Sequence, residues 1–191
     1  MLNTAQLEGN MRKALCVLPL VVLLCLSFAC QDKAAMAELE KYKAQAKVEE
    51  QNKALFRKKI EEWNKSNYEY LKEAMAPNYV GYSPSANPKS SSKDETLEAI
   101  KGEREGFPDS IWSIEDLVAV GDMVISRNIF RGTHKGNFGG IPATGNRIEA
   151  SFILMSRIIN GKIVEERGEF DMLGFMQQLG MELKPIAAKK K

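Results

Sequence analysis

The sequence has 191 residues, of which 27 are basic and 25 acidic, and its formal net charge at pH 7 is +2. This length suits one domain with residues to spare. Because the charges nearly balance, the strongly basic surface of a nucleic-acid binder is excluded, and we expect no nucleic-acid partner.

The start of the chain has the features of an export signal. Arg12 and Lys13 precede an almost wholly apolar run over residues 14–29. As a helix this run reaches about 24 Å, short of the roughly 30 Å hydrocarbon core of a bilayer. Residues 1–29 are therefore predicted to be a signal peptide rather than a membrane span, with translation starting at Met11.

The end of the apolar run, LSFAC, resembles the lipobox of bacterial lipoproteins. The resemblance implies that Cys30 is lipidated and becomes the mature N-terminus, at the cell membrane or outer membrane, with the domain outside the cytoplasm. An ordinary secreted protein cut nearby is the alternative. The other two cysteines lie inside the signal, so the mature chain has no disulfide and no cysteine metal site.

Helical segments follow the signal. Residues 31–54 are rich in Ala, Lys and Glu, which predicts a semi-rigid helical spacer. Beyond the spacer, Phe56, Ile60, Trp63 and Tyr70 recur at helical spacing. They predict an apolar helix face that packs onto a core.

Two Ser-x-x-Glu patterns mark further helix starts. Ser66 with Glu69 predicts a helix that runs through Met75, and Ser92 with Glu95 predicts another. The stretch YVGYSP between the two patterns is predicted to be a short strand.

Four β-rich runs then fill the chain, at residues 111–120, 123–133, 147–159 and 162–171. Gly121-Asp122 and Asn160-Gly161 separate them as two-residue hairpin turns. Helices followed by an antiparallel meander predict an α+β fold. We expect the helices to pack in a strongly curved antiparallel sheet, with a pocket between the two layers.

The later segments resemble the SnoaL-like polyketide cyclase (ester cyclase) family of the nuclear-transport-factor-2-like superfamily. The resemblance covers residues 55–183, with 184–191 as a basic tail, and depends on FPD, IEDLVAVGDMV, RGTHKGNFGGIPATG, NGKIVEE and DMLGFMQQLG. It implies a cone-shaped α+β barrel with a pocket for a small apolar, carbonyl-bearing or aromatic ligand. It also implies cofactor-free cyclase or isomerase chemistry. Family members commonly dimerise through the sheet face, so a homodimer is left open.

The same resemblance implies that Asp171 is the general base. The alternative is that Asp171 only caps the helix that follows it. Because side chains alternate along a strand, Arg167, Glu169 and Asp171 share one face and Phe170 lies on the other. The resemblance places the first three on the pocket side, with Arg167 and Glu169 as polar contacts to the ligand.

Further candidates come from single positions. Arg157 stands near the family's His position, where it could polarise a carbonyl or point to solvent. His134 is the one histidine of the chain, and could lie at the pocket rim or make a structural hydrogen bond; a lone His argues against zinc. Trp112 and Tyr82 are candidate ligand contacts. The function is therefore either an acid/base enzyme or a non-catalytic binding or dimerising module on the same scaffold.

Overall fold

The computed structural model describes residues 4–83, 90–182 and 184, with the backbone alone for residues 4–32. Its elements are α1 (Thr4–Asn64), α2 (Tyr68–Ala74), β1 (Met75–Tyr82), β2 (Ser90–Ser92), α3 (Lys93–Gly106), β3 (Ile111–Val120), β4 (Met123–Thr133), β5 (Arg147–Ile159), β6 (Lys162–Phe170) and α4 (Met172–Gln178). They divide into two compact units, Met1–Ala46 and Lys47–Lys191, with the boundary inside α1.

The first unit is helical throughout its described residues, and the predicted spacer is part of α1. Exposed ion pairs such as Lys43 with Glu40, at 2.9 Å, lie along the spacer. Within the described chain, no helix has an apolar stretch long enough to cross a membrane. The signal peptide and the lipidation of Cys30 stay predictions.

The second unit begins at Lys47, and residues of α1 near this boundary contact the β3–β4 turn. The Asn52 amide donates to the Gly121 carbonyl at 3.1 Å. The Glu49 carboxylate accepts from the Gly121 N–H at 2.8 Å. These two bonds tie the helix to the turn.

The predicted apolar face of α1 is confirmed in its last turns. Phe56 and Ile60 are buried in the core, and Trp63 packs against it while partly exposed, as does Tyr70 from α2. Burial of these side chains holds the end of α1 to the rest of the unit.

The two predicted capping boxes have different outcomes. The one at Ser92 is confirmed: its hydroxyl accepts from the Glu95 N–H at 3.4 Å, and the Glu95 carboxylate accepts from the Ser92 N–H at 2.8 Å. The one at Ser66 is wrong, because Ser66 adopts a positive φ of 58°. Asn67 caps α2 instead, with Oδ1 accepting from the Tyr70 N–H at 3.2 Å.

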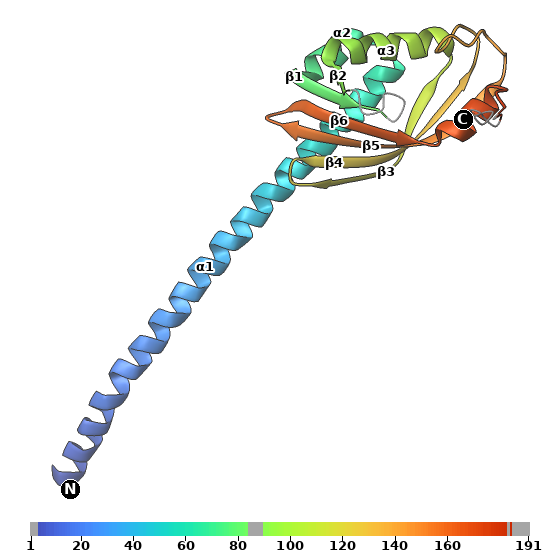
Figure 1. The fold of residues 1–191 in the computed structure, drawn as a ribbon. Helices are drawn as coiled ribbons and strands as arrows, with labels where there is room; N and C mark the ends of the chain where they lie inside the picture. The colour runs from blue at the N-terminus through green and yellow to red at the C-terminus, as the bar shows by residue number, and fades with distance from the viewer. Residues whose placement is uncertain (1–3, 84–89, 183, 185–191) are drawn as a thin grey trace, which may run out of the picture. The chain divides into compact units, whose positions relative to one another are not determined.

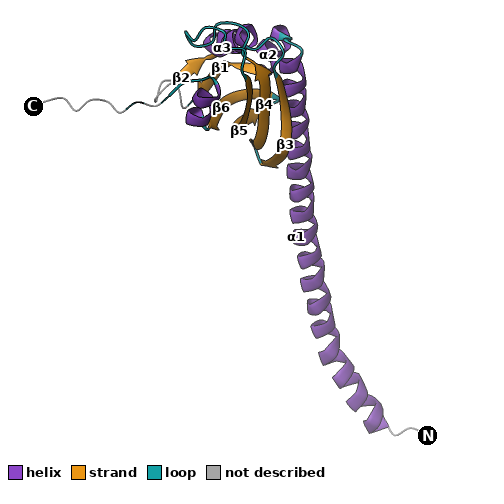
Figure 2. Ribbon diagram, turned by 90° about the vertical axis from the view of Figure 1, so that its right-hand side faces the viewer, coloured by secondary structure: helices purple, strands orange, loops and turns teal. Residues whose placement is uncertain are grey.

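The six strands form one curved sheet in the order β2-β1-β6-β5-β4-β3 (Figure 2). The four predicted runs are β3 to β6 and pair antiparallel, as expected. However, β1 pairs in parallel with β6. The sheet is therefore mixed rather than wholly antiparallel. Parallel strands need a long connection, which α3 and the meander provide here. The α+β class with a curved sheet is confirmed.

Both predicted hairpin turns are present. Asn160 and Gly161 have φ values of 51° and 70°, and positive φ at both positions defines the type I′ turn that suits twisted strands. Between β3 and β4, Gly121 has a φ of 61°. These turns set the register of the meander.

The concave face of the sheet carries the core. Along β4 every second side chain is buried, from Val124 to Phe130. Above this face α3 lies against α2 and β1 (Figure 1), and it buries Leu97 and Ile100. Between these layers the core does not close, and a pocket is left.

Candidate functional site

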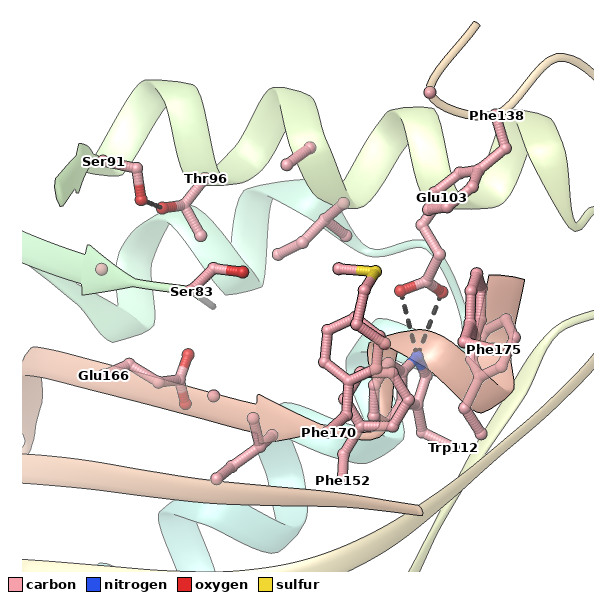
Figure 3. Close-up of a pocket in the computed structure, with 18 of the residues that line it drawn as sticks. Ser83, Ser91, Thr96, Glu103, Trp112, Phe138, Phe152, Glu166, Phe170 and Phe175 are labelled. Carbon is pink, nitrogen blue, oxygen red and sulfur yellow. Dashed lines mark hydrogen bonds between the residues drawn. The ribbon is translucent and has the colours of Figure 1, made fainter. Parts of the chain in front are cut away.

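A pocket of about 560 Å³ lies between the concave face of the sheet, α3 and α4 (Figure 3). A cavity of this size suits a drug-sized ligand. Its lining is mainly apolar, and much of it is aromatic: Trp112, Phe130, Phe138, Phe152, Phe170 and Phe175.

Strand pairing builds the aromatic wall. Phe152 and Phe170 are register partners on β5 and β6, and their rings stack with centroids 4.3 Å apart. Trp112 and Phe130 are partners on β3 and β4, with centroids 5.3 Å apart. Cross-strand aromatic pairs of this kind stabilise the sheet. They also present ring surfaces on which a flat ligand can lie.

Glu103 is an acid on the pocket-facing side of α3. It lies three residues after Ile100, which places both side chains on one helix face. The Trp112 indole Nε1–H donates to both carboxyl oxygens, at 3.0 and 3.2 Å. The Ser110 hydroxyl adds a third hydrogen bond at 3.3 Å. Figure 3 shows the carboxyl among the aromatic rings.

Burial raises the pKa of Glu103 to about 7, against the opposing effects of the Trp112 hydrogen bond, the Arg104 charge and the Ser110 hydroxyl. Glu103 keeps some accessible surface and lines the pocket, so we infer that this surface faces the cavity. The Trp63 N–H lies near enough to favour the carboxylate. It is not in hydrogen-bonding geometry, and it has no partner among the described residues.

The end of α1 fixes this part of the pocket. The Asn64 side chain accepts from the Trp112 backbone N–H at 2.8 Å and donates to the Trp112 carbonyl at 2.9 Å. Arg104 donates to the carbonyls of Trp63 and Asn64 at 3.2 Å, and to that of Ser110 at 2.8 Å. These hydrogen bonds fix the backbone of Trp112, and so they position the indole that contacts Glu103.

A second carboxylate, Glu166 on β6, also lines the pocket. It forms a buried ion pair with Lys59 of α1, and the Ser156 hydroxyl donates to it at 2.6 Å. The Tyr79 hydroxyl lies 3.5 Å from the other oxygen. Burial raises the pKa of Tyr79, and the Glu166 charge raises it further. Tyr79 therefore stays a neutral hydroxyl donor.

The predicted placement of Arg167, Glu169 and Asp171 on the pocket side is wrong. They share one strand face, as expected, but the residues of β6 that line the pocket are Glu166, Gly168 and Phe170. The stacking of Phe170 on Phe152 turns the alternate side chains outward. Arg167 pairs with Glu165 at 2.8 Å.

Asp171 is exposed and caps α4, where its Oδ1 accepts from the Gly174 N–H at 2.9 Å. Arg157 is also outside the pocket lining and pairs with Asp122 at 2.7 Å. The geometry gives both residues a structural partner, and the catalytic roles predicted for them stay untested.

His134 is fully buried and does not line the pocket. Its Nδ1 accepts from the Thr144 N–H at 3.3 Å, and its ring lies 5.1 Å from that of Phe107. The structural hydrogen bond, one of its two predicted roles, is therefore present. Its Nε2 has no partner among the described residues.

Two other predicted ligand contacts do line the pocket, Trp112 and Tyr82. The Arg167 guanidinium covers the Tyr82 ring at 4.1 Å. Sequence reasoning missed Glu103 and Glu166. For Glu103, its helical spacing from Ile100 was a signal in the sequence. For Glu166 there was no signal, because the sequence does not show which face of β6 is buried.

Within the described residues, no group of three or more His, Cys, Asp or Glu side chains could hold a metal ion. The side chain of Cys30 lies outside the described ones. The lipid anchor and the homodimer stay predictions.

The part of the chain that forms the pocket is similar to a known protein family. The model of the SnoaL-like polyketide cyclases matches residues 53–179. Aklanonic acid methyl ester cyclase DnrD of Streptomyces peucetius is 42% identical over 60 residues, which are 31% of this chain and 41% of that protein. The chain thus matches about two fifths of the length of this curated relative.

Solved structures share the fold. IdmH of Streptomyces antibioticus has 29% identity and a TM-score of 0.61, over 68% of this chain and 99% of IdmH. A protein of Jannaschia sp. has 20% identity and a TM-score of 0.65, over 71% and 96% of the two chains. The second likeness concerns the fold alone.

Proposed function

Because the chain belongs to the SnoaL-like polyketide cyclase family, we propose that its pocket binds a flat, apolar, carbonyl-bearing molecule and that Glu103 exchanges a proton with it. The observation that carries this proposal is the Glu103 carboxyl in an aromatic pocket, with its pKa raised to about 7. A general acid or base works best when its pKa is near the working pH.

In the proposed reaction, ionised Glu103 removes a proton from the carbon next to the ligand's carbonyl. The C–H electron pair moves onto the carbonyl oxygen, giving an enolate, and the proton is held on Glu103. Trp63 lines the pocket, and its Nε1–H is buried without a hydrogen-bond partner among the described residues. This N–H would donate to the enolate oxygen. Return of the proton to another carbon gives isomerisation. Attack of the enolate carbon on a second carbonyl, with the proton passing to the new alkoxide, gives ring closure.

The test is proton exchange into a model substrate. Ethyl benzoylacetate in D₂O, followed by proton NMR with the protein-free rate subtracted, is expected to exchange its methylene protons faster with the protein. Glu103→Gln should return the rate to background. Asp171→Asn, which keeps a capping side chain, is the matched control and should retain the acceleration.

The pH dependence gives a second readout. Because the base must be ionised, the accelerated rate should rise with pH through about 7, the pKa of Glu103. Full acceleration in Glu103→Gln, or its loss in Asp171→Asn, would return the role to Asp171.

Binding without catalysis is the second candidate. The observation that favours it is that Glu103 already accepts hydrogen bonds from Trp112 and Ser110, which suits a structural role as well. Ligand binding with no exchange above background would support this candidate.

We also propose that the mature protein is a lipoprotein, anchored by Cys30 with its domain outside the cytoplasm. The support is the LSFAC lipobox that ends the apolar run. Metabolic labelling with a clickable palmitate in a bacterial host should label the wild type and not Cys30→Ala. Equal labelling of both would overturn the anchor.

A homodimer through the outer sheet face is a further part of the proposal. Val118, Val120, Ile125 and Ile153 are exposed there, and exposed apolar side chains that gather in one patch are typical of an interface. Light scattering of the purified domain should give twice the monomer mass, and Ile125→Lys should give the monomer mass. A monomeric wild type would overturn this proposal.

A further inference from the structure

The end of the pocket away from Glu103 carries hydroxyl groups and the second carboxylate. Figure 3 shows Ser91, Thr96 and Glu166 at this end, while Glu103 and most of the aromatic rings occupy the other. Ser91 Oγ and Thr96 Oγ1 lie 2.8 Å apart. The Tyr79 hydroxyl lies 3.5 Å from Glu166 Oε2. The pocket therefore has two chemically different ends.

Gly81 on β1 allows three of these hydroxyls to converge. A Cβ atom there would lie 2.6 Å from Ser91 Oγ and 3.0 Å from both Thr96 Oγ1 and the Tyr79 hydroxyl oxygen. Any larger residue would push the hydroxyls apart. Because Gly81 also lines the pocket, its missing side chain lets the three hydroxyls gather at one part of the pocket wall. We call this polar end of the pocket the recess.

Glu166 supplies a hydrogen-bond acceptor at the edge of this recess. Its Oε1 is occupied by Lys59 and by the Ser156 hydroxyl. Its Oε2 has the long contact to Tyr79, and a carboxylate oxygen has two lone pairs. Oε2 can therefore accept from one more donor, supplied by a ligand.

The charge of the site limits what that donor can be. The buried Lys59 ammonium compensates the Glu166 carboxylate, so a ligand's ammonium group would find no uncompensated charge at Glu166. A ligand's carboxylate would be repelled by Glu166. A neutral group that both donates and accepts hydrogen bonds suits the recess best, and a hydroxyl does both.

We propose that the recess formed by Tyr79, Gly81, Ser91, Thr96 and Glu166 is a hydroxyl-recognition subsite, and that the ligand is an aromatic molecule with a neutral hydroxyl at that end. This inference rests on the proposed function, because it assumes a flat ligand in the pocket. The ligand's hydroxyl donates to Glu166 Oε2 and accepts from the hydroxyl cluster. Binding in this orientation directs the carbonyl end of the ligand toward Glu103.

The test compares three ligands by isothermal titration calorimetry. They are an acetylnaphthol with the hydroxyl and acetyl groups at opposite ends of the rings, its methyl ether, and acetylnaphthalene. The ether keeps the oxygen and loses the donor. A hydrogen bond to a charged group predicts that the wild type binds the naphthol about tenfold more tightly than the ether.

Two variants test which residues of the recess cause the preference for the naphthol. Lys59→Met/Glu166→Gln removes both charges, because Glu166→Gln alone would leave a buried ammonium unpaired. It should reduce the preference to about threefold, as expected for a hydrogen bond between neutral partners. Thr96→Val keeps the ion pair, so it should keep the preference over the ether. It removes a donor to the ligand's oxygen, so it should weaken the naphthol about threefold relative to acetylnaphthalene, which has no such oxygen.

The matched control removes an exposed ion pair on the outer sheet face, Arg131→Met/Glu149→Gln, where the two side chains pair at 3.0 Å. It should keep the full preference. Circular dichroism checks that each variant is folded. If the double variant at Lys59 and Glu166 does not fold, Thr96→Val decides.

The outcomes separate the two proposals. Equal binding of the naphthol and its ether to the wild type would overturn the subsite and leave the apolar pocket as proposed. The subsite would also be overturned by an undiminished preference over the ether in the folded Lys59→Met/Glu166→Gln variant, or by an undiminished preference over acetylnaphthalene in Thr96→Val. Failure of all three compounds to bind would overturn the ligand class and, with it, this inference.

Discussion

Replacing Glu103 with Gln should change the pH dependence of stability. Folding raises the pKa of Glu103 from 4.5 to about 7, so between these values the folded state binds more protons than the unfolded state. The contribution of Glu103 to the free energy of unfolding of the wild type should therefore fall as pH rises from 4.5 to 7. The pKa change from 4.5 to about 7, at about 1.4 kcal/mol per pKa unit, means that Glu103 ionisation lowers the free energy of unfolding by about 3 kcal/mol over this pH range.

Gln resembles protonated Glu in shape and cannot ionise. The Glu103→Gln variant should therefore match the wild type near pH 4.5, where Glu103 is protonated in the folded protein, and exceed its stability by up to about 3 kcal/mol at pH 8. Urea unfolding followed by circular dichroism, at a series of pH values between these limits, measures the difference. Since the other carboxyl groups titrate in both proteins, the comparison isolates Glu103.

The outcome that would refute this reasoning is a constant stability difference between the two proteins across the series. That result would mean that Glu103 ionises in the folded protein as it does in water. The acid/base role proposed for Glu103 would then no longer be supported by a raised pKa. A variant that is less stable than the wild type at every pH would instead show that the carboxyl is needed for its hydrogen bonds.

Three further predictions use the same unfolding assay. Glu166→Gln should lose about 3–5 kcal/mol because it leaves Lys59 buried and unpaired, and adding Lys59→Met should recover most of the loss; no recovery would contradict the buried pair. Ser92→Ala should lose about 1 kcal/mol through the capping box of α3, and an unchanged stability would argue against the cap. Gly81→Ala should lose about 1–3 kcal/mol through overpacking against the hydroxyl cluster, whereas Gly102→Ala, at a half-buried position of α3 with no neighbour near the new Cβ, should lose none.

Much of the fold could be predicted because its signals are local. The Asn160-Gly161 turn and the strands on either side of it follow from backbone preference and side-chain alternation, which a few neighbouring residues set. The Ser92 cap is local in the same way. The cap at Ser66 failed on a local competition, since Asn67 offers an equally good capping side chain one residue later.

The parallel pairing of β1 with β6 could not be predicted, because the two strands are far apart in sequence and no turn joins them. Which face of β6 is buried also could not be predicted from the sequence. Alternation shows which residues share a face, but a strand pattern with charged residues on both faces does not indicate which face is buried. Packing of Phe170 on Phe152 made that choice, and it placed Glu166 in the pocket and Asp171 outside.

By itself, the sequence determined the class of the fold, the family and the aromatic residues from which a pocket could be built, because these depend on periodicity and on motifs in a fixed order. The tertiary structure alone decided which acids the pocket contains. Glu103 and Glu166 come from different elements, and each obtains its chemical character from distant partners, Trp112 and Lys59. Such contacts depend on how elements pack, and burial among those partners is what raises the pKa of Glu103 and compensates the charge of Glu166.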